Sequence, residues 1–109
     1  MILHEIIQAC GGLEVEEKRR SSDEYIELVF LNKELDQWIT ILTEILGPPI
    51  KPAGVKPTKN DLLITQAYGG IFRNQTLFRK KSENGIVIVM LWPWQDTVHV
   101  TLKMALIIL

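Results

Sequence analysis

The strand-like segment at residues 86–92 constrains the fold more than any other feature of the chain. Its sequence, IVIVMLW, is rich in branched and aromatic residues and apolar on both faces. A strand of an antiparallel sheet that is covered on one side alternates apolar with polar residues, so this strand needs cover on both sides. In a chain of 109 residues, the helices can cover one face, and a second protomer is the simplest cover for the other. The alternative is a strongly curled sheet that wraps its own core.

The remaining pattern predicts an α+β domain. Helices are expected over residues 1–10, 33–46 and 58–68, and strands over residues 13–20, 25–31, 76–82, 86–92 and 97–109. Asn32 is a plausible N-cap for the second helix, and Thr58 with Asp61 has capping-box spacing for the third. The Asn84-Gly85 pair is a strong hairpin signal. We expect a single two-layer domain with a five-stranded antiparallel sheet and two or three helices mainly on one face.

This element order resembles that of profilin-like and roadblock-like small domains, and more loosely that of secretion-chaperone-like dimers. The resemblance implies a fold and no function.

A short echo divides the chain. Residues 6–13 (IIQACGGL) return as residues 64–71 (ITQAYGGI), and a basic hairpin follows each copy. The echo indicates either two related halves, 1–46 and 58–109, or only a shared helix-to-strand transition, because glycine ends many helices. Both Gly-Gly pairs are therefore expected at helix ends. Strict duplication would make residues 97–109 a helix, but their alternating pattern favours a strand.

The segment between these halves, residues 47–57, holds four of the five prolines. Backbone restricted in this way predicts an extended connection on the surface, within one domain.

Composition limits the class of protein. A hydrophobic fraction of 47% and a charged fraction of 23% are typical of a folded domain, and the net charge is −1. The first 50 residues carry ten acids and four bases, whereas residues 51–109 carry three acids and eight bases. One cysteine, no signal-like amino terminus and no apolar run long enough to span a membrane together predict a cytoplasmic protein.

Candidate catalytic groups are few. Cys10 ends an apolar helical stripe, where we expect a buried structural thiol. No metal-binding, phosphate-loop or hydrolase motif is present, so we predict no cofactor, no metal and no enzyme. The third-ranked hypothesis is an acid–base pair formed by Asp96 and His99, three residues apart in a turn.

The carboxyl-terminal half offers a weak anion-binding hypothesis. Basic residues are interleaved there with Tyr68, Phe72 and Phe78, a composition that single-stranded nucleic acid uses for stacking. The candidates are Arg73, Arg79, Lys80 and Lys81. Nucleic-acid or polyanion binding is therefore the alternative function, and a solvated basic hairpin is the structural alternative.

The Trp92-Pro93-Trp94 turn is the most unusual surface candidate. A tryptophan in a turn either covers the core or anchors a partner. Together with the two-faced strand, it leads to the first hypothesis: a small, non-catalytic, cytoplasmic interaction or regulatory module that acts as a homodimer. The predicted interface residues are Trp92, Trp94, Ile88, Met90 and Ile107, and the turn is also a possible site for a protein partner.

Overall fold

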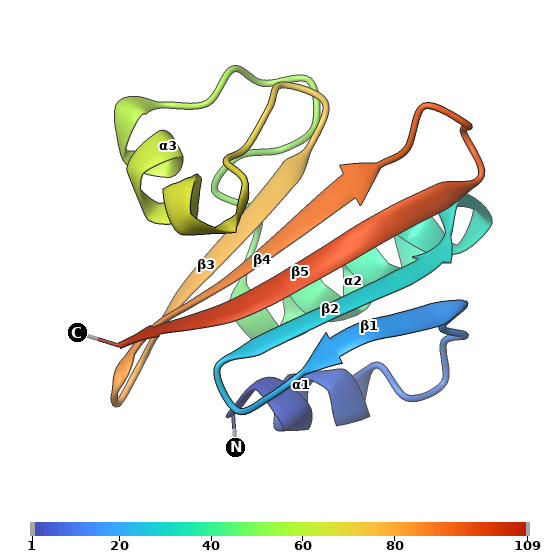
Figure 1. Ribbon diagram of the computed structural model, residues 1–109, viewed down its shortest axis with the longest axis horizontal. Coiled ribbons are helices and arrows are strands. Elements are labelled where there is room, and N and C mark those ends of the chain that lie inside the picture. The colour runs from blue at the N-terminus through green and yellow to red at the C-terminus, as the bar shows by residue number, and fades with distance from the viewer. Residues whose placement is uncertain (1, 109) are drawn as a thin grey trace.

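The computed structural model describes residues 2–108, with Ile2 described by its backbone only. Five strands form one antiparallel sheet in the order β1-β2-β5-β4-β3 (Figure 1). The strands are β1 (Glu17–Ser21), β2 (Tyr25–Leu31), β3 (Thr76–Ser82), β4 (Gly85–Pro93) and β5 (His99–Ile108). The helices are α1 (Ile2–Ala9), α2 (Leu35–Leu46) and α3 (Lys59–Thr65), with short 3-10 helices η1 (Asn32–Glu34) and η2 (Gln66–Tyr68). The predicted α+β fold is confirmed, and residues 99–108 form a strand.

The last strand occupies the centre of the sheet. β5 pairs with β2 on one side and with β4 on the other, so the β1–β2 and β3–β4 hairpins flank it (Figure 1). β2 and β4 run in the same direction on either side of β5, since each of them is antiparallel to it. The sequence relation between the two halves of the chain stays a prediction.

Helices α1 and α2 cover one face of the sheet, which we call the first face. There, Leu3 and Ile6 of α1 and Trp38 and Leu42 of α2 pack on alternate residues of four strands. These residues include Phe30 of β2, whose ring stacks on that of Trp38 at 4.6 Å between ring centroids. This cluster is the main core of the domain.

A smaller cluster lies on the opposite, second face. It contains Leu77, Ile88, Met90 and Ala105 of the sheet, covered by Ile71 with Ile64 and Tyr68 from the α3 region. Ile88 and Met90 are 0% exposed within a single chain. The chain itself therefore supplies both covers that residues 86–92 require, and this strand needs no second protomer to cover it.

Several boundaries differ from the prediction. β1 begins at Glu17, because Leu13 packs against the main core from an irregular connection and not from a strand. Asn32 does not cap a helix through its side chain; its amide donates to the backbone oxygen of Thr97 at 3.4 Å. The tight turn of the second hairpin is Glu83-Asn84, and Gly85 is already paired with Ser82.

The third helix follows its predicted signals. Thr58 and Asp61 form the capping box, with each side chain accepting a hydrogen bond from the other residue's backbone N–H. Both Gly-Gly pairs follow helices, as predicted. Gly69 is left-handed, and the N–H of Gly70 donates to the oxygen of Thr65 at 2.9 Å, which is a Schellman-type ending.

The proline-rich connection is anchored at one point. Lys51 forms an isolated antiparallel bridge with Leu77 at the outer edge of β3. Lys51 is only 1% exposed, although the connection was expected on the surface. None of the helices within residues 2–108 is long and apolar enough to cross a membrane.

Candidate functional site

A set of half-buried aromatic rings lies on the part of the second face that α3 leaves open. Figure 1 shows α3 beside β3, at the opposite edge of the sheet from β1 and β2. We call the set the aromatic surface, and define it by four rings and three cations. Its members are Tyr25, Tyr68, Trp92, Trp94, Arg19, Arg20 and Lys103.

At one end of the aromatic surface, Tyr25 of β2 stacks on Tyr68 of η2. Their ring centroids are 5.6 Å apart and the planes are nearly parallel, at 8°. The Arg20 guanidinium lies 5.6 Å from the Tyr25 centroid. The Tyr25 hydroxyl donates to Glu27, and burial together with this carboxylate raises the pKa of Tyr25 well above its ordinary value. Tyr25 is therefore a neutral hydrogen-bond donor throughout the physiological range.

Lys103 of β5 occupies the middle. Its Nζ lies 3.4 Å from the centroid of Trp92 and donates to the backbone oxygen of Tyr68 at 3.0 Å. Burial lowers the pKa of Lys103, and the nearby Glu27 carboxylate opposes that effect. The indole N–H of Trp92 is buried without a hydrogen-bond partner among the described residues. Lys103 thus ties η2 to the sheet while its charge sits on an aromatic ring.

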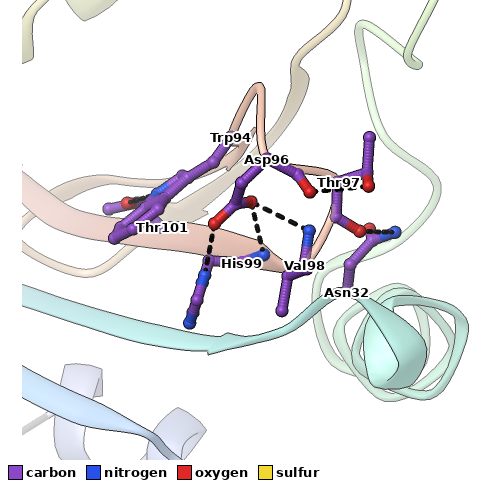
Figure 2. Close-up of polar contacts among 7 residues, drawn as sticks. All are labelled: Asn32, Trp94, Asp96, Thr97, Val98, His99 and Thr101. Atoms are coloured by element: carbon purple, nitrogen blue, oxygen red, sulfur yellow. Dashed lines mark hydrogen bonds and ion pairs between the residues drawn. The ribbon is translucent and has the colours of Figure 1, made fainter.

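Trp94 forms the other end, at the turn between β4 and β5. Its Nε1 donates to the Thr101 hydroxyl at 2.7 Å, as Figure 2 shows. Its ring lies 4.7 Å from the His99 ring and 5.4 Å from the Arg19 guanidinium. Arg19 also pairs with Glu17 at 2.6 Å. These contacts hold the half-buried indole in a fixed orientation.

Asp96 and His99 meet as the sequence suggests. Asp96 Oδ2 lies 2.6 Å from His99 Nδ1, while Oδ1 accepts the backbone N–H groups of Val98 and His99 at 2.8 and 3.0 Å (Figure 2). The bond with the His99 ring is the main reason why the pKa of Asp96 falls to about 2. The following residue, Thr97, has a left-handed backbone with φ of 61°. The carboxylate therefore organises a strained turn, and through the His99 ring it also supports Trp94.

The predicted anion-binding residues are not gathered with the aromatic rings. Arg79 and Lys81 project from one side of β3, opposite Ile88 and Ile86 of β4, and Lys80 projects from the other. Lys80 donates to the oxygen of Ile45 at the end of α2, at 2.8 Å. Phe78 is fully buried in the main core. Arg73 lies on the exposed loop before β3. The interleaving seen in the sequence therefore does not produce a stacking surface.

The predicted interface residues are divided between surface and core. Trp92 and Trp94 are half-buried and belong to the aromatic surface. Ile107 is partly buried at the rim of the second cluster. Ile88 and Met90, in contrast, lie wholly beneath the α3 region and cannot contact another molecule in this conformation.

Sequence reasoning missed the role of Arg19, Arg20, Tyr25 and Lys103. Alternation along β2 and β5 places Tyr25 and Lys103 on one face, but only the strand register brings Glu27 opposite Lys103. The bulge in β1 between Lys18 and Arg20 then allows both arginines to reach that face. No local pattern predicts such a register between strands that are far apart in the chain.

Cys10 is buried in the main core, and burial raises the pKa of its thiol to about 11. Among residues 2–108, no group of three or more acidic, histidine or cysteine side chains could hold a metal ion. No protein-family model, curated protein or solved structure matches the chain. The geometry of the aromatic surface, which combines tryptophan, tyrosine and arginine in fixed orientations, is suited to contact with another protein.

Proposed function

We propose that the protein is a non-catalytic interaction module of the cytoplasm and that two copies pair through the aromatic surface. The observation that supports this proposal is the continuous, half-buried set of rings and cations that runs from Tyr68 to Trp94 across β2, β5 and β4. Tryptophan, tyrosine and arginine are the residues most often found at energetic centres of protein interfaces.

The charges on this surface suit a twofold contact. Its cations, including Arg19 and Lys103, lie next to the carboxylates of Glu17 and Glu27. A surface with both signs can be complementary to itself, because rotation by half a turn can bring a cation of one copy opposite a carboxylate of the other. The cytoplasmic part of the proposal is supported by the lone cysteine, Cys10, which is a free thiol.

Sedimentation velocity tests the homodimer. We expect a dimer at tens of micromolar, and we expect Trp94→Ala to weaken association by about tenfold or more, since tryptophans that act as interface hot spots contribute roughly 2 kcal/mol or more. Phe72→Ala is the matched control, because Phe72 is an exposed aromatic residue outside the aromatic surface. Circular dichroism confirms that both variants are folded. A wild-type protein that sediments as a monomer at this concentration would overturn the proposal.

A further inference from the structure

Helix α3 turns two polar side chains inward and two leucines outward, while its Ile64 packs against the second cluster. Its buried residues are polar, with Asp61 at 5% and Thr65 at 0% exposure, whereas Leu62 and Leu63 are 48% and 68% exposed. A surface helix of a soluble domain normally turns its leucines toward the core. Packing in the core of this chain therefore does not account for the exposure of Leu62 and Leu63.

The polar residues are turned inward because their bonds are satisfied there. The Asp61 carboxylate accepts the N–H of Thr58 at 2.9 Å in the capping box. The Thr65 hydroxyl donates to the backbone oxygen of Asp61 at 2.7 Å. These local hydrogen bonds allow the two polar side chains to be buried, and Ile64 packs against the second cluster on the inward side of α3. As a consequence, the two leucines face outward without an intramolecular partner surface.

The outward face is concave. Lys59, Leu62, Leu63 and Gln66 of α3 and η2, together with Gly69 and Gly70, line a shallow recess of about 650 Å³. Gly70 has no atom within 4 Å of the position where a Cβ would stand, so the wall formed by this turn is bare backbone. We call this recess and its two leucines the α3 surface. A recess with apolar walls accepts a side chain of a folded or helical partner.

The exposed charges of the segment that forms the α3 surface have one sign. Between Gly47 and Ser82 the only acidic residue is the buried Asp61, while Lys56, Lys59 and Arg73 are exposed on α3 and its flanking loops. No carboxylate pairs with any of these three cations among the described residues. Lys59 thus lies at the recess itself, and the segment that forms the α3 surface carries exposed cations and no exposed carboxylate of its own.

This combination selects one kind of partner. A second copy of the chain would bring the exposed cations of this segment against themselves across a twofold axis, which is unfavourable. Binding to a bilayer scales with the apolar area that it buries, whereas the exposed apolar side chains of this seven-residue helix are Leu62 and Leu63. We propose that the α3 surface docks an acidic amphipathic segment of a partner protein, with a large apolar side chain in the recess and carboxylates against Lys59 and Arg73.

The proposal is independent of the homodimer, because the aromatic surface and the α3 surface use different residues. It is tested with a synthetic helical peptide of about 15 residues that has leucines at helical spacing and glutamates elsewhere. Nuclear magnetic resonance of the ¹⁵N-labelled protein monitors the backbone amides. We expect the amides of residues 59–73 to shift on titration, and the affinity to fall as ionic strength rises. A peptide with lysines in place of the glutamates should leave these amides unchanged.

Matched variants separate the apolar and the charged contributions. Leu63→Gln should weaken binding of the acidic peptide by about tenfold, since a large apolar anchor is lost. Val98→Gln, at an exposed apolar residue outside the α3 surface, is its control. Lys59→Glu combined with Arg73→Glu should abolish binding of the acidic peptide and permit binding of the lysine peptide, while Lys33→Glu should have no effect.

Three results would overturn the proposal. The first is the absence of any shift at millimolar acidic peptide, and the second is equal binding of the two peptides. The third is binding of the protein, through Leu63, to vesicles that contain about one third phosphatidylserine, without binding of the peptide. Sedimentation of Leu63→Gln should match that of the wild type, so a failure here is distinguishable from a failure of the homodimer.

Discussion

The buried side chain of Lys51 joins two loops of the chain through hydrogen bonds. Its ammonium group is buried and donates to the backbone oxygens of Pro52 at 3.0 Å and Arg73 at 2.9 Å, and also to that of Gln75. Burial lowers the pKa of Lys51, and the charge of Asp61 opposes that change. The lysine therefore joins the loop before α3 to the loop after it, in the manner of a bound cation.

Lys51→Met should reduce the free energy of unfolding by roughly 2–4 kcal/mol, because it removes three charge-assisted hydrogen bonds in a buried place, although the oxygens of Pro52 and Arg73 each keep a backbone donor. Lys56→Met, an exposed change in the same connection, should alter it by no more than about 0.5 kcal/mol. Urea unfolding followed by circular dichroism compares the two variants. Equal stability would show that the carbonyl groups find other partners.

At the turn between β4 and β5, Asp96 should make the stability of the protein depend on pH. The pKa of its carboxyl is depressed to about 2 from an ordinary value of 3.8. The folded state therefore binds this proton less readily than the unfolded chain does. The contribution of Asp96 to stability is complete above about pH 4 and is lost as the pH falls through about 2.

His99→Ala should raise the pKa of Asp96 toward its ordinary value, because the bond to the His99 ring is the largest cause of the shift. The backbone N–H groups of Val98 and of residue 99 should keep part of the depression. Carbon-13 resonance of the labelled carboxyl group measures the titration. His4→Ala, which changes the other histidine, is the control. An unchanged pKa of Asp96 in His99→Ala would show that the bond to the His99 ring is not the main cause of the depression.

At the scale of elements, local sequence signals predicted those structures whose hydrogen bonds are local. The capping box of α3 uses residues three positions apart, and the structure contains it. Asn32 also had the residue type of a cap, but a carbonyl from the distant Thr97 competes for its side chain. The irregular course of residues 13–16 was missed because Leu13 alternates with polar neighbours yet packs from a loop.

Gly85 illustrates a constraint that arises between elements. A Cβ at this position would stand 1.9 Å from the backbone oxygen of Ile107 in the neighbouring β5. The glycine is thus needed for the approach of two strands and not for the turn that the sequence suggested.

Gly85→Ala should lower the free energy of unfolding by about 1–3 kcal/mol or more, since the β4 and β5 backbones must separate. Gly12→Ala is the matched control, because a Cβ there has no atom within 4 Å and the backbone is not left-handed. Its stability should lie within about 1 kcal/mol of the wild type. Thermal unfolding measures both variants. An unchanged stability of Gly85→Ala would show that the β4 and β5 backbones can separate here at little cost in free energy.

For the whole molecule, the sequence predicted the number and the type of elements but not their partners. The five strands followed from alternation and turn signals, whereas the central position of β5 depends on contacts between distant residues. The cover of the second face is another such case. Its small apolar cluster is completed by Tyr68 and Ile71, which no periodic pattern assigns to the sheet.

The two proposed surfaces differ in the charges that they carry. The aromatic surface carries both signs and suits a second copy, while the α3 surface carries one sign and suits an acidic partner. In these two proposals, the uneven distribution of acids and bases along the chain, which the net charge of −1 conceals, gives the two surfaces different partners.

The central place of β5 also has a consequence for synthesis. β2 and β4 do not pair with each other, and both require β5, which follows them in the chain. A nascent chain that has not yet reached His99 holds two separate hairpins, and the apolar β4 has no neighbour on one side. The sheet can therefore be completed only after β5 has been synthesised, and until then the unpaired edge of the apolar β4 is open to pairing with other chains.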